Sequence, residues 1–231
     1  MRRNVVLSVL VGALFLALPL AAGALGLDIE AKVGGGLAAG TTSNPNQTGS
    51  PRAGFEAGLD FDVFLLSAGP VDLGLSLGGQ FSYLTFHGVL NVPAAPPFIP
   101  VAFTLTSDSN YKYINIPISI VGRLPIDDSL RLTFRAGGFI GYFLGGASDN
   151  SYSPPIQPNG TVTLDSSTTV QWEYGIHVTG GVDIALVGGL ALSPSVVFDM
   201  GLTNTTNTPG YAYSDTFWSL TAMIGIKYTV F

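Results

Sequence analysis

The ionisable side chains that could do chemistry in this chain recur at alternating positions within apolar segments. Asp60 and Asp62 stand between apolar residues of one segment, and Arg131 and Arg135 do so in another. Because side chains alternate between the two faces of a β-strand, such segments place their charges on one face. The pattern predicts one inward-facing charge cluster, made of Glu56, Asp60, Asp62, Asp72, Arg123, Arg131, Arg135, Glu173, His177, Asp183, Asp199 and Lys227.

Two uses of this cluster are open on the sequence alone. Buried charges persist where they are paired and hydrogen-bonded, so one use is a structural salt-bridge plug that also holds water. The other use is a narrow path for ions or solutes, lined by the same charges.

Metal and cofactor chemistry is not predicted. The chain contains no Cys and no pair of His residues at metal-ligand spacing, and no acidic stretch has the spacing of a calcium-binding loop. The run Gly34-Gly35-Gly36 lies within a predicted strand with no helix or Lys after it, so it is not a phosphate-binding loop. We expect no cofactor and no metal.

The kind of element that positions these residues is clearest between Val170 and Leu186. Every second residue of this stretch is apolar or Gly, and the residues between them are polar or small. A period of two predicts a β-strand with one apolar face. Strands of soluble proteins usually have about 5–6 residues, so this length favours a membrane-spanning strand whose apolar face meets lipid.

Eight segments carry the pattern and predict an all-β protein, a transmembrane antiparallel up-and-down barrel. They cover residues 27–37, 55–65, 71–83, 114–124, 130–144, 170–186, 190–202 and 218–230. Three connections are tight, at 67–70, 125–129 and 187–189, and four are long, at 41–51, 87–110, 145–167 and 203–215. This alternation is typical of outer-membrane barrels with short periplasmic turns and long extracellular loops. Residues 161–164 also alternate, so the strands on either side of that loop could continue above the membrane as a hairpin.

Composition agrees with this class. The 231 residues are 47% hydrophobic but 10% charged, and no apolar run of 18 residues follows the leader, so no membrane-spanning helix is predicted. Removing Arg2 and Arg3 with the leader leaves 7 basic residues against 15 acidic ones, a net charge of −8. Such an acidic chain argues against nucleic acid as a partner.

The first 24 residues predict a signal peptide. Arg2 and Arg3 precede an apolar core from Val5 to Leu20, and Ala22-Gly23-Ala24 is a small-residue cleavage site. A membrane anchor is the alternative, which the short core disfavours. We expect residues 25–231 to form a single barrel domain.

Aromatic residues near the strand ends predict belts at the two membrane interfaces. The set beside the long loops contains Phe81, Tyr83, Phe86, Tyr111, Tyr113, Tyr142, Phe143, Trp172, Tyr174, Phe217 and Trp218. A smaller set near the tight turns contains Phe61, Phe64, Tyr228 and Phe231.

Two short motifs carry a family resemblance. The segment Tyr113-Ile114-Asn115-Ile116-Pro117 resembles a Tyr-x-x-Ile-Pro motif of PorT-like barrels, and the last strand ends in the aromatic Phe231. The chain from Leu25 onward thus resembles the small eight-stranded outer-membrane barrels of the OmpX, OmpA-barrel and PorT-like type. The resemblance implies location in the bacterial outer membrane and recognition of the C-terminal strand by the barrel-assembly machinery. Within the strands, Pro117 and Pro194 predict bulges or register breaks.

Catalysis is not expected. His177 shares a strand face with Glu173 and Thr179, and His-x-Thr is similar to the His-x-Ser arrangement of outer-membrane lipid A deacylases. Those enzymes use Ser on the lipid-facing side, whereas Thr179 faces the interior of the predicted barrel. We expect His177 to be a hydrogen-bonded lumen residue.

One long loop holds an apolar patch that could bind a hydrophobic ligand or partner, or could pack over the barrel mouth as a lid. Its candidate residues are Phe98, Ile99, Val101 and Phe103. We therefore expect a non-catalytic monomer in contact with outer-membrane lipid, which serves envelope structure or surface interaction with an unidentified extracellular ligand. A narrow channel is the alternative. A soluble lipocalin-like carrier would need its apolar face inward, and the terminal Phe231 and the few charges argue against it.

Overall fold

The fold is built from long β-strands. The structure is a computed structural model that describes residues 26–95, 99, 101–156, 158–205 and 213–230, so the predicted signal peptide and Phe231 lie outside the described residues. In that part of the chain no helix is long and apolar enough to span a membrane. The strands are β1 (Gly26–Thr42), β2 (Gln47–Ala68), β3 (Val71–Val92), β4 (Phe103–Pro125), β5 (Leu130–Ser153), β6 (Gly160–Leu164), β7 (Trp172–Ala185), β8 (Leu190–Gly201) and β9 (Asp215–Thr229).

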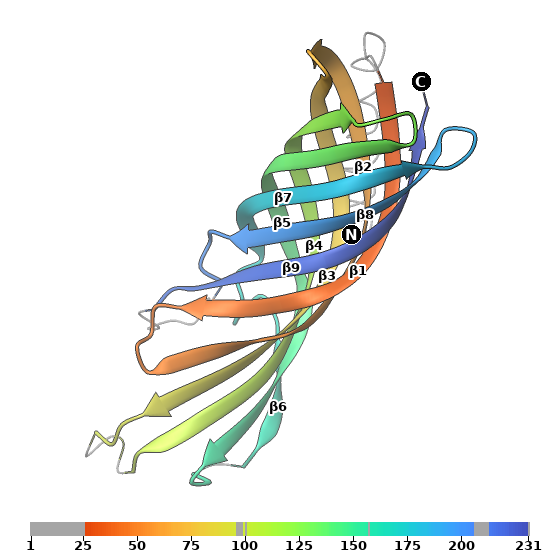
Figure 1. Cartoon of the computed structure of the whole chain (residues 1–231). Coiled ribbons are helices and arrows are strands. Elements are labelled where there is room, and N and C mark those ends of the chain that lie inside the picture. The colour runs from red at the N-terminus through yellow and green to blue at the C-terminus, as the bar shows by residue number, and fades with distance from the viewer. Residues whose placement is uncertain (1–25, 96–98, 100, 157, 206–212, 231) are drawn as a thin grey trace, which may run out of the picture.

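Eight of these strands close into an antiparallel ring. Neighbours pair in the order β1-β2-β3-β4-β5-β7-β8-β9, and β9 pairs back with β1, where Ala31 lies opposite Ile226 (Figure 1). The predicted eight-stranded barrel is therefore confirmed. The strand β6 is an addition to it and pairs with the outer half of β5, with Val162 opposite Ser148.

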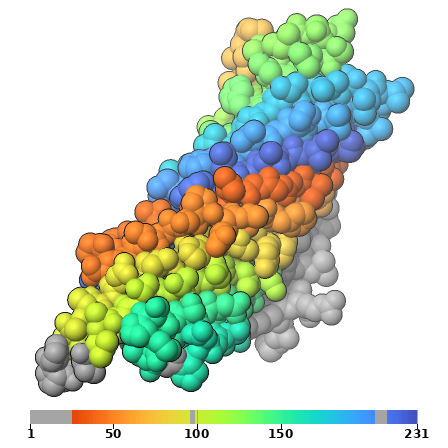
Figure 2. All heavy atoms as spheres, turned by 60° about the horizontal axis from the view of Figure 1, so that its bottom comes forward, coloured from red at the N-terminus to blue at the C-terminus, as the bar shows by residue number. Residues whose placement is uncertain are grey.

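The two faces of the wall differ as the alternation predicts. On β7, the side chain of Val178 is 42% exposed on the outside, while the adjacent His177 is 2% exposed on the inside. The same contrast holds on β9 between Ile224 and Ser219. Apolar residues thus face outward and polar residues inward, which is the reverse of a soluble carrier barrel. In Figure 2 the strands cross this outer surface as tilted bands.

The strands on one side of the barrel run well past the predicted boundaries. The strand β4 begins at Phe103 rather than 114, and β3 continues to Val92 rather than 83. Much of the predicted loops at 87–110 and 145–167 is therefore paired strand. Outside a membrane neither face has to be apolar, so the alternating pattern stops while the hydrogen-bond ladder continues. We call this protruding sheet the ledge; it consists of residues 47–53, 84–92, 103–112, 145–153 and 160–164 (Figure 1).

The tight turns close the other end of the barrel. Gly188 and Gly189, which join β7 to β8, have φ values of 65° and 81°, a region that favours Gly. In the β4–β5 turn, the carboxylate of Asp127 accepts hydrogen bonds from the backbone N–H groups of Ser129 and Leu130 at 2.7 and 2.8 Å. Both connections lie where the sequence predicts tight turns.

The two strand prolines interrupt pairing without shifting it. Beside Pro117, the β3–β4 ladder stops at Leu77–Ile118 and resumes in the same register at Gln80–Asn115. Beside Pro194, the β7–β8 ladder likewise resumes in register. The prediction of bulges or register breaks at these two prolines is wrong. A proline lacks the N–H group for one ladder hydrogen bond, but it adds no residue to the strand, so the register stays the same. The register shifts of the described strands lie instead at Pro51/Phe55, Phe64/Leu66 and Lys112/Tyr113.

The predicted aromatic belt is only partly correct. Trp172 and Tyr174 are about half exposed on the outer surface, as a belt requires. Five residues of the same predicted set instead face inward, where they are buried or largely buried; they are Phe86, Tyr111, Tyr113, Phe143 and Phe217. Phe64 also faces inward, beneath the guanidinium of Arg123, which lies 4.0 Å from its ring centre.

Candidate functional site in the barrel lumen

The lumen near the tight turns is filled by a charged network centred on Arg135 of β5. Its guanidinium Nη2 lies 2.6 Å from Glu30 Oε2 of β1 and 2.7 Å from Asp62 Oδ2 of β2, and Nη1 lies 3.5 Å from Asp60 Oδ2. Lys32 of β1 pairs with Asp60 at 2.6 Å. These side chains are at most 4% exposed. The network therefore joins β5 to β1 and β2 across the lumen.

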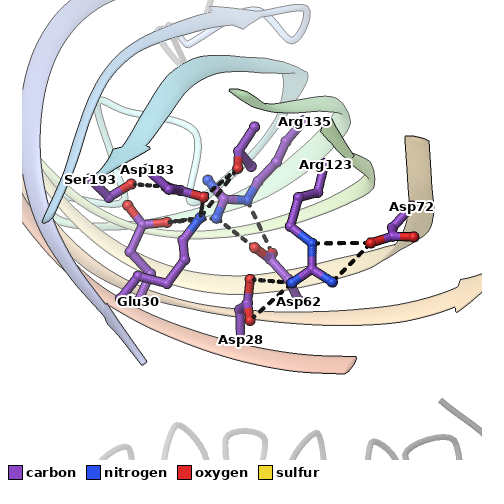
Figure 3. Close-up of polar contacts among 10 residues, drawn as sticks. Asp28, Glu30, Asp62, Asp72, Arg123, Arg135, Asp183 and Ser193 are labelled. Atoms are coloured by element: carbon purple, nitrogen blue, oxygen red, sulfur yellow. Dashed lines mark hydrogen bonds and ion pairs between the residues drawn. The ribbon is translucent and has the colours of Figure 1, made fainter. Parts of the chain in front are cut away.

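A second branch of the network surrounds Asp183. Lys227 Nζ lies 2.7 Å from Asp183 Oδ2, and the hydroxyls of Thr133 and Ser193 donate to the same carboxylate at 2.6 and 2.7 Å (Figure 3). Lys227 also lies 3.6 Å from Glu30 Oε2, which links this branch to Arg135.

A third branch lies nearest the turns, around Arg123. Its guanidinium contacts Asp28 of β1 at 3.3 Å and Asp72 of β3 at 3.0 Å (Figure 3). The pairing of buried charges thus extends from the turn end well into the barrel.

Arg131 is a predicted member that stays outside the network. No carboxylate of the described residues lies within ion-pair distance of it. Its side chain instead lines a cavity of about 240 Å³ at the turn end, together with Leu186, Leu190 and Lys227.

Farther along the lumen, His177 connects β7 to β8. His177 Nδ1 lies 2.6 Å from Asp199 Oδ1, and Thr179 Oγ1 lies 3.1 Å from His177 Nε2. Gln80 Nε2 donates to the second oxygen of Asp199 at 3.3 Å. The order of carboxylate, imidazole and hydroxyl is that of a nucleophilic triad. However, Thr179 is 2% exposed and lines neither of the two cavities described here.

The next layer outward contains Glu56 and Glu173, which are 1% and 5% exposed. Glu56 Oε1 accepts a hydrogen bond from Ser219 at 3.0 Å, and no Lys or Arg of the described residues pairs with either Glu. Both line a small cavity of about 10 Å³ with Ser82, Asn115 and Asp199. Among the described residues, the predicted cluster is thus split into an inner part whose carboxylates pair with Lys and Arg and an outer part whose two Glu residues do not.

Apolar and aromatic side chains close the lumen above this layer. We call them the aromatic plug; its members are Ala38, Leu84, Phe86, Tyr111, Tyr113, Phe143 and Phe217. The rings of Phe86 and Phe217 stack with centroids 4.5 Å apart, and Tyr111 lies 4.8 Å from Phe217. Leu164 of β6 packs against the plug from the ledge.

The predicted loop patch lies at the tip of the β3–β4 hairpin rather than over the barrel mouth. Ile99 and Ala95 exchange backbone hydrogen bonds at 2.8 and 2.9 Å, and Val101 is 51% exposed. Phe103 lies 6.1 Å from the Tyr152 ring in the ledge. Phe98 lies outside the described residues. None of the described members of the patch packs against the side chains that close the barrel mouth, which are those of the plug.

One ionic contact lies on the ledge. His87 Nδ1 lies 2.9 Å from Asp108 Oδ1, and Arg52 Nη2 lies 3.3 Å from the same oxygen. The hydrogen bond from His87, and then the nearby Arg52, lower the pKa of Asp108 below its ordinary value.

A protein-family model identifies the family of this chain. The model described as "Outer membrane protein beta-barrel domain" matches residues 21–207, which is more than half of the chain. The chain belongs to this family. The outer-membrane β-barrel described here is therefore located in the bacterial outer membrane, and its ledge is on the long-loop, extracellular side.

Several solved structures are similar to this outer-membrane β-barrel. The outer membrane protein OprG from Pseudomonas aeruginosa is 12% identical with a TM-score of 0.47, over 89% of this chain and 96% of that chain. Neisserial surface protein A is 11% identical with a TM-score of 0.44, over 87% and 96%. The outer membrane protease OmpT from Escherichia coli is 12% identical with a TM-score of 0.41, over 87% and 96%. No curated protein sequence matches the chain.

Sequence reasoning missed two parts of the lumen of this outer-membrane β-barrel. Asp28, Glu30 and Lys32 alternate on β1 and belong to the network, so the same rule that found the other charges could have included them. The plug was missed because all of its residues except Phe143 lie beyond the predicted strand ends. Extending the strand parity would have placed Phe86 and Tyr111 on the inner face, since Phe86 shares parity with Ser82 and Tyr111 with Asn115.

Proposed function

We propose that this outer-membrane barrel is a non-catalytic, non-conducting scaffold that presents its ledge to other molecules at the cell surface. The observation that carries the proposal is the contrast between a lumen filled by side chains from the turn-end cavity to the aromatic plug and a paired sheet that projects beyond the barrel. A rigid wall that displays an extended extracellular surface suits recognition rather than passage.

The filled lumen supports the closed state over the channel alternative. An eight-stranded barrel has an interior just wide enough for side chains. Here the inner part is crossed by the ion pairs of Arg135, and the outer part is closed by the stacked rings of Phe86 and Phe217. A conducting path would require both layers to open.

The same arrangement argues against catalysis at the one triad-like group. Thr179 lies beside His177 in the buried interior, with charged and aromatic layers on either side. Part of the lumen would have to unfold before a substrate could reach the Thr179 hydroxyl. We therefore assign His177 a structural role, as a hydrogen-bonded link between β7 and β8.

The ledge supports an interaction role because its outermost strand has an open edge. Among the described residues, β6 pairs only with β5, and four of its five residues are exposed. Free strand edges are sites where another chain can add a strand. Exposed apolar side chains lie nearby, with Val162 on β6 at 47% and Val101 at 51% exposed.

Conductance in planar bilayers tests the closed state. We expect no unitary current from the refolded wild-type chain, and none from a Phe86→Ala/Phe217→Ala double variant, because the ion pairs of Arg135 still cross the inner lumen. Small, discrete steps should appear only when Arg135→Ala is added to that double variant, so that both layers are opened. A reproducible wild-type current would favour the channel alternative and overturn the proposal.

A trimmed ledge tests the interaction role. A variant in which residues 87–110 and 148–162 are replaced by short turns should keep the heat-dependent gel mobility of a folded barrel. Cells that display it should adhere less to matrix-coated glass and to one another than cells with the full chain. Equal adhesion by both would remove the support for a surface role. We further propose that the barrel is monomeric and that its C-terminal strand is recognised by the barrel-assembly machinery.

A further inference from the structure

We propose that the free edge of β6 pairs with the β6 edge of a second copy of this chain. The two strands run antiparallel around a two-fold axis, which places Val162 opposite Val162 of the second copy. The inference rests on the proposed function, because it names the partner that the ledge recognises.

The edge of β6 that faces away from β5 is open in the described part of the chain. Backbone pairing in the ledge passes from β3 through β4 and β5 to β6 and ends there (Figure 1). Residues 160–163 are all exposed, and Val162 is 47% exposed. The outward backbone groups of β6 are therefore free to form a ladder with another strand.

The strand β6 also lacks the features with which proteins usually block a sheet edge. Such edges commonly carry Lys or other charged side chains, Pro, or a β-bulge. The segment Gly160-Thr161-Val162-Thr163-Leu164 contains no Pro and no ionisable residue, and its register against β5 is unbroken. Three of its five residues are β-branched, which favours strand pairing.

The order of residues in β6 makes the strand complementary to itself. When two copies pair antiparallel around Val162, Thr161 of each copy lies opposite Thr163 of the other. Cross-strand pairs of Thr residues and of β-branched residues stabilise antiparallel sheets. A two-fold contact of this kind uses the same surface on both partners and closes after two copies.

No like charges face each other in the paired sheet. The ionisable residue of β5 that lies opposite β6 is Asp149, which is placed behind Thr161 and accepts a hydrogen bond from its hydroxyl at 2.5 Å. The residue behind Thr163 is Ala147. The two-fold axis therefore brings Asp149 into one row with Ala147 of the second copy, and the two Asp149 carboxylates lie in different rows.

The antiparallel arrangement decides where the second copy is located. The ledge continues the barrel wall, so β6 follows the direction of the tilted barrel strands (Figure 1). An antiparallel partner reverses this direction, and the barrel of the second copy points the opposite way. Since both ledges are extracellular, the two barrels belong to two facing membranes. The pairing therefore joins two cells.

The strength of this contact depends on the number of copies. An edge of five residues is a small contact beside the roughly 1,200–2,000 Å² that stable interfaces bury. Isolated barrels should thus remain monomeric in detergent. Between two cells, many copies bind at once, and the effective concentration raises the overall affinity without any new contact.

Disulfide formation tests the register of the pair, because the natural chain has no Cys. Full chains are placed in nanodiscs, one barrel per disc, and oxidised. We expect linked dimers from Val162→Cys, and also from a mixture of Thr161→Cys discs with Thr163→Cys discs. Thr163→Cys alone should give at least fivefold less, since diagonal residues are too far apart for a disulfide. The control Val101→Cys replaces a Val of the ledge that is 51% exposed and lies outside β6.

Exchanging charges on whole cells tests the identity of the partner. Val162→Lys or Val162→Glu places like charges opposite each other across the two-fold axis, whereas a mixture of the two strains brings opposite charges together. In a host with short lipopolysaccharide, we expect each variant alone to sediment as slowly as cells without the barrel. The mixture and the control Val101→Lys should sediment as fast as wild type. Heat-dependent gel mobility confirms that each variant is folded.

Two results would overturn the inference. Val162→Cys could yield no more dimer than Val101→Cys, or cells with Val162→Lys could sediment as fast as wild-type cells. If the full chain still adheres better than the trimmed ledge to matrix-coated glass, either result removes the second copy as the partner and leaves the surface role in place. Equal adhesion by the full and trimmed chains would instead remove the surface role itself.

Discussion

The guanidinium of Arg135 on β5 lies 2.6 Å from the carboxylate of Glu30 on β1, although these strands are not neighbours in the ring. The same guanidinium group lies 2.7 Å from Asp62 on β2. One side chain thus braces the wall across the lumen, where no backbone hydrogen bond can reach. The β1–β9 ladder closes the barrel, and contacts across the lumen such as Arg135–Glu30 support its round cross-section.

Replacing Arg135 should therefore destabilise the barrel strongly. Arg135→Met leaves Glu30 and Asp62 buried without their main partner, and loss of one member of a buried ion pair costs about 3–5 kcal/mol. Urea unfolding in detergent, followed by the heat-dependent gel shift, measures this loss. Arg131→Met on the same strand is the matched control and should stay within about 0.5 kcal/mol of wild type, because Arg131 forms no ion pair with a described residue. Equal losses for the two variants would contradict a specific bracing role.

The outward apolar face should be sensitive to charge only where it meets lipid. Ile120 on β4 is 62% exposed and Ile126 in the β4–β5 turn is 53% exposed, so the two residues have similar contact with the surroundings. Ile120→Arg should cost about 2–4 kcal/mol in a bilayer, since lipid cannot solvate the charge. Ile126→Arg should cost less than about 0.5 kcal/mol. Reversible unfolding from lipid vesicles provides the comparison, and similar costs would place both residues in water.

One glycine of β1 should tolerate no side chain. A Cβ at Gly36 would overlap the backbone carbonyl oxygen of Leu220 on β9, while a Cβ at Gly180 on β7 would meet nothing within 4 Å. Gly36→Ala should force the closing β1–β9 pair apart and cost about 1–3 kcal/mol or more. The folded fraction after refolding, scored by gel mobility, should fall for Gly36→Ala and remain at the wild-type level for Gly180→Ala. Efficient refolding of both would mean that the ladder relaxes at Gly36.

The contact between Asp108 and His87 should give the ledge a weak dependence on pH. The pKa of Asp108 is lowered in the folded protein, so its contribution to stability is present above the ordinary value of 3.8 and is lost as the pH falls through the lowered value. Because Asp108 is more than half exposed, solvent screens the contact and Asp108→Asn should cost less than about 1 kcal/mol at pH 6. The unfolding free energies of the variant and the wild type should converge once the pH has fallen well below 3.8. A difference that persists there would assign the effect to packing instead.

The class of this protein could be predicted because a membrane imposes a strict rule on sequence. Lipid requires an apolar outer face, and a strand expresses that rule with a period of two, as from Trp172 to Ala185. The same alternation placed Arg135, Asp62 and His177 on the inner face. The rule stops at the membrane surface, so the ends of β3, β4 and β5 were predicted as loops although the ladder continues through them.

Which residues face inward follows from the order of residues along each strand, because strand parity is a local property. Which of them meet depends on the fold, because contacts across the lumen depend on the stagger of all eight strands around the ring. That stagger places Arg135 beside Glu30, leaves Arg131 at the turn-end cavity and separates Glu56 and Glu173 from every Lys and Arg that forms an ion pair in the described lumen. It also turns Phe86 and Phe217 from a predicted lipid belt into the plug that closes the barrel.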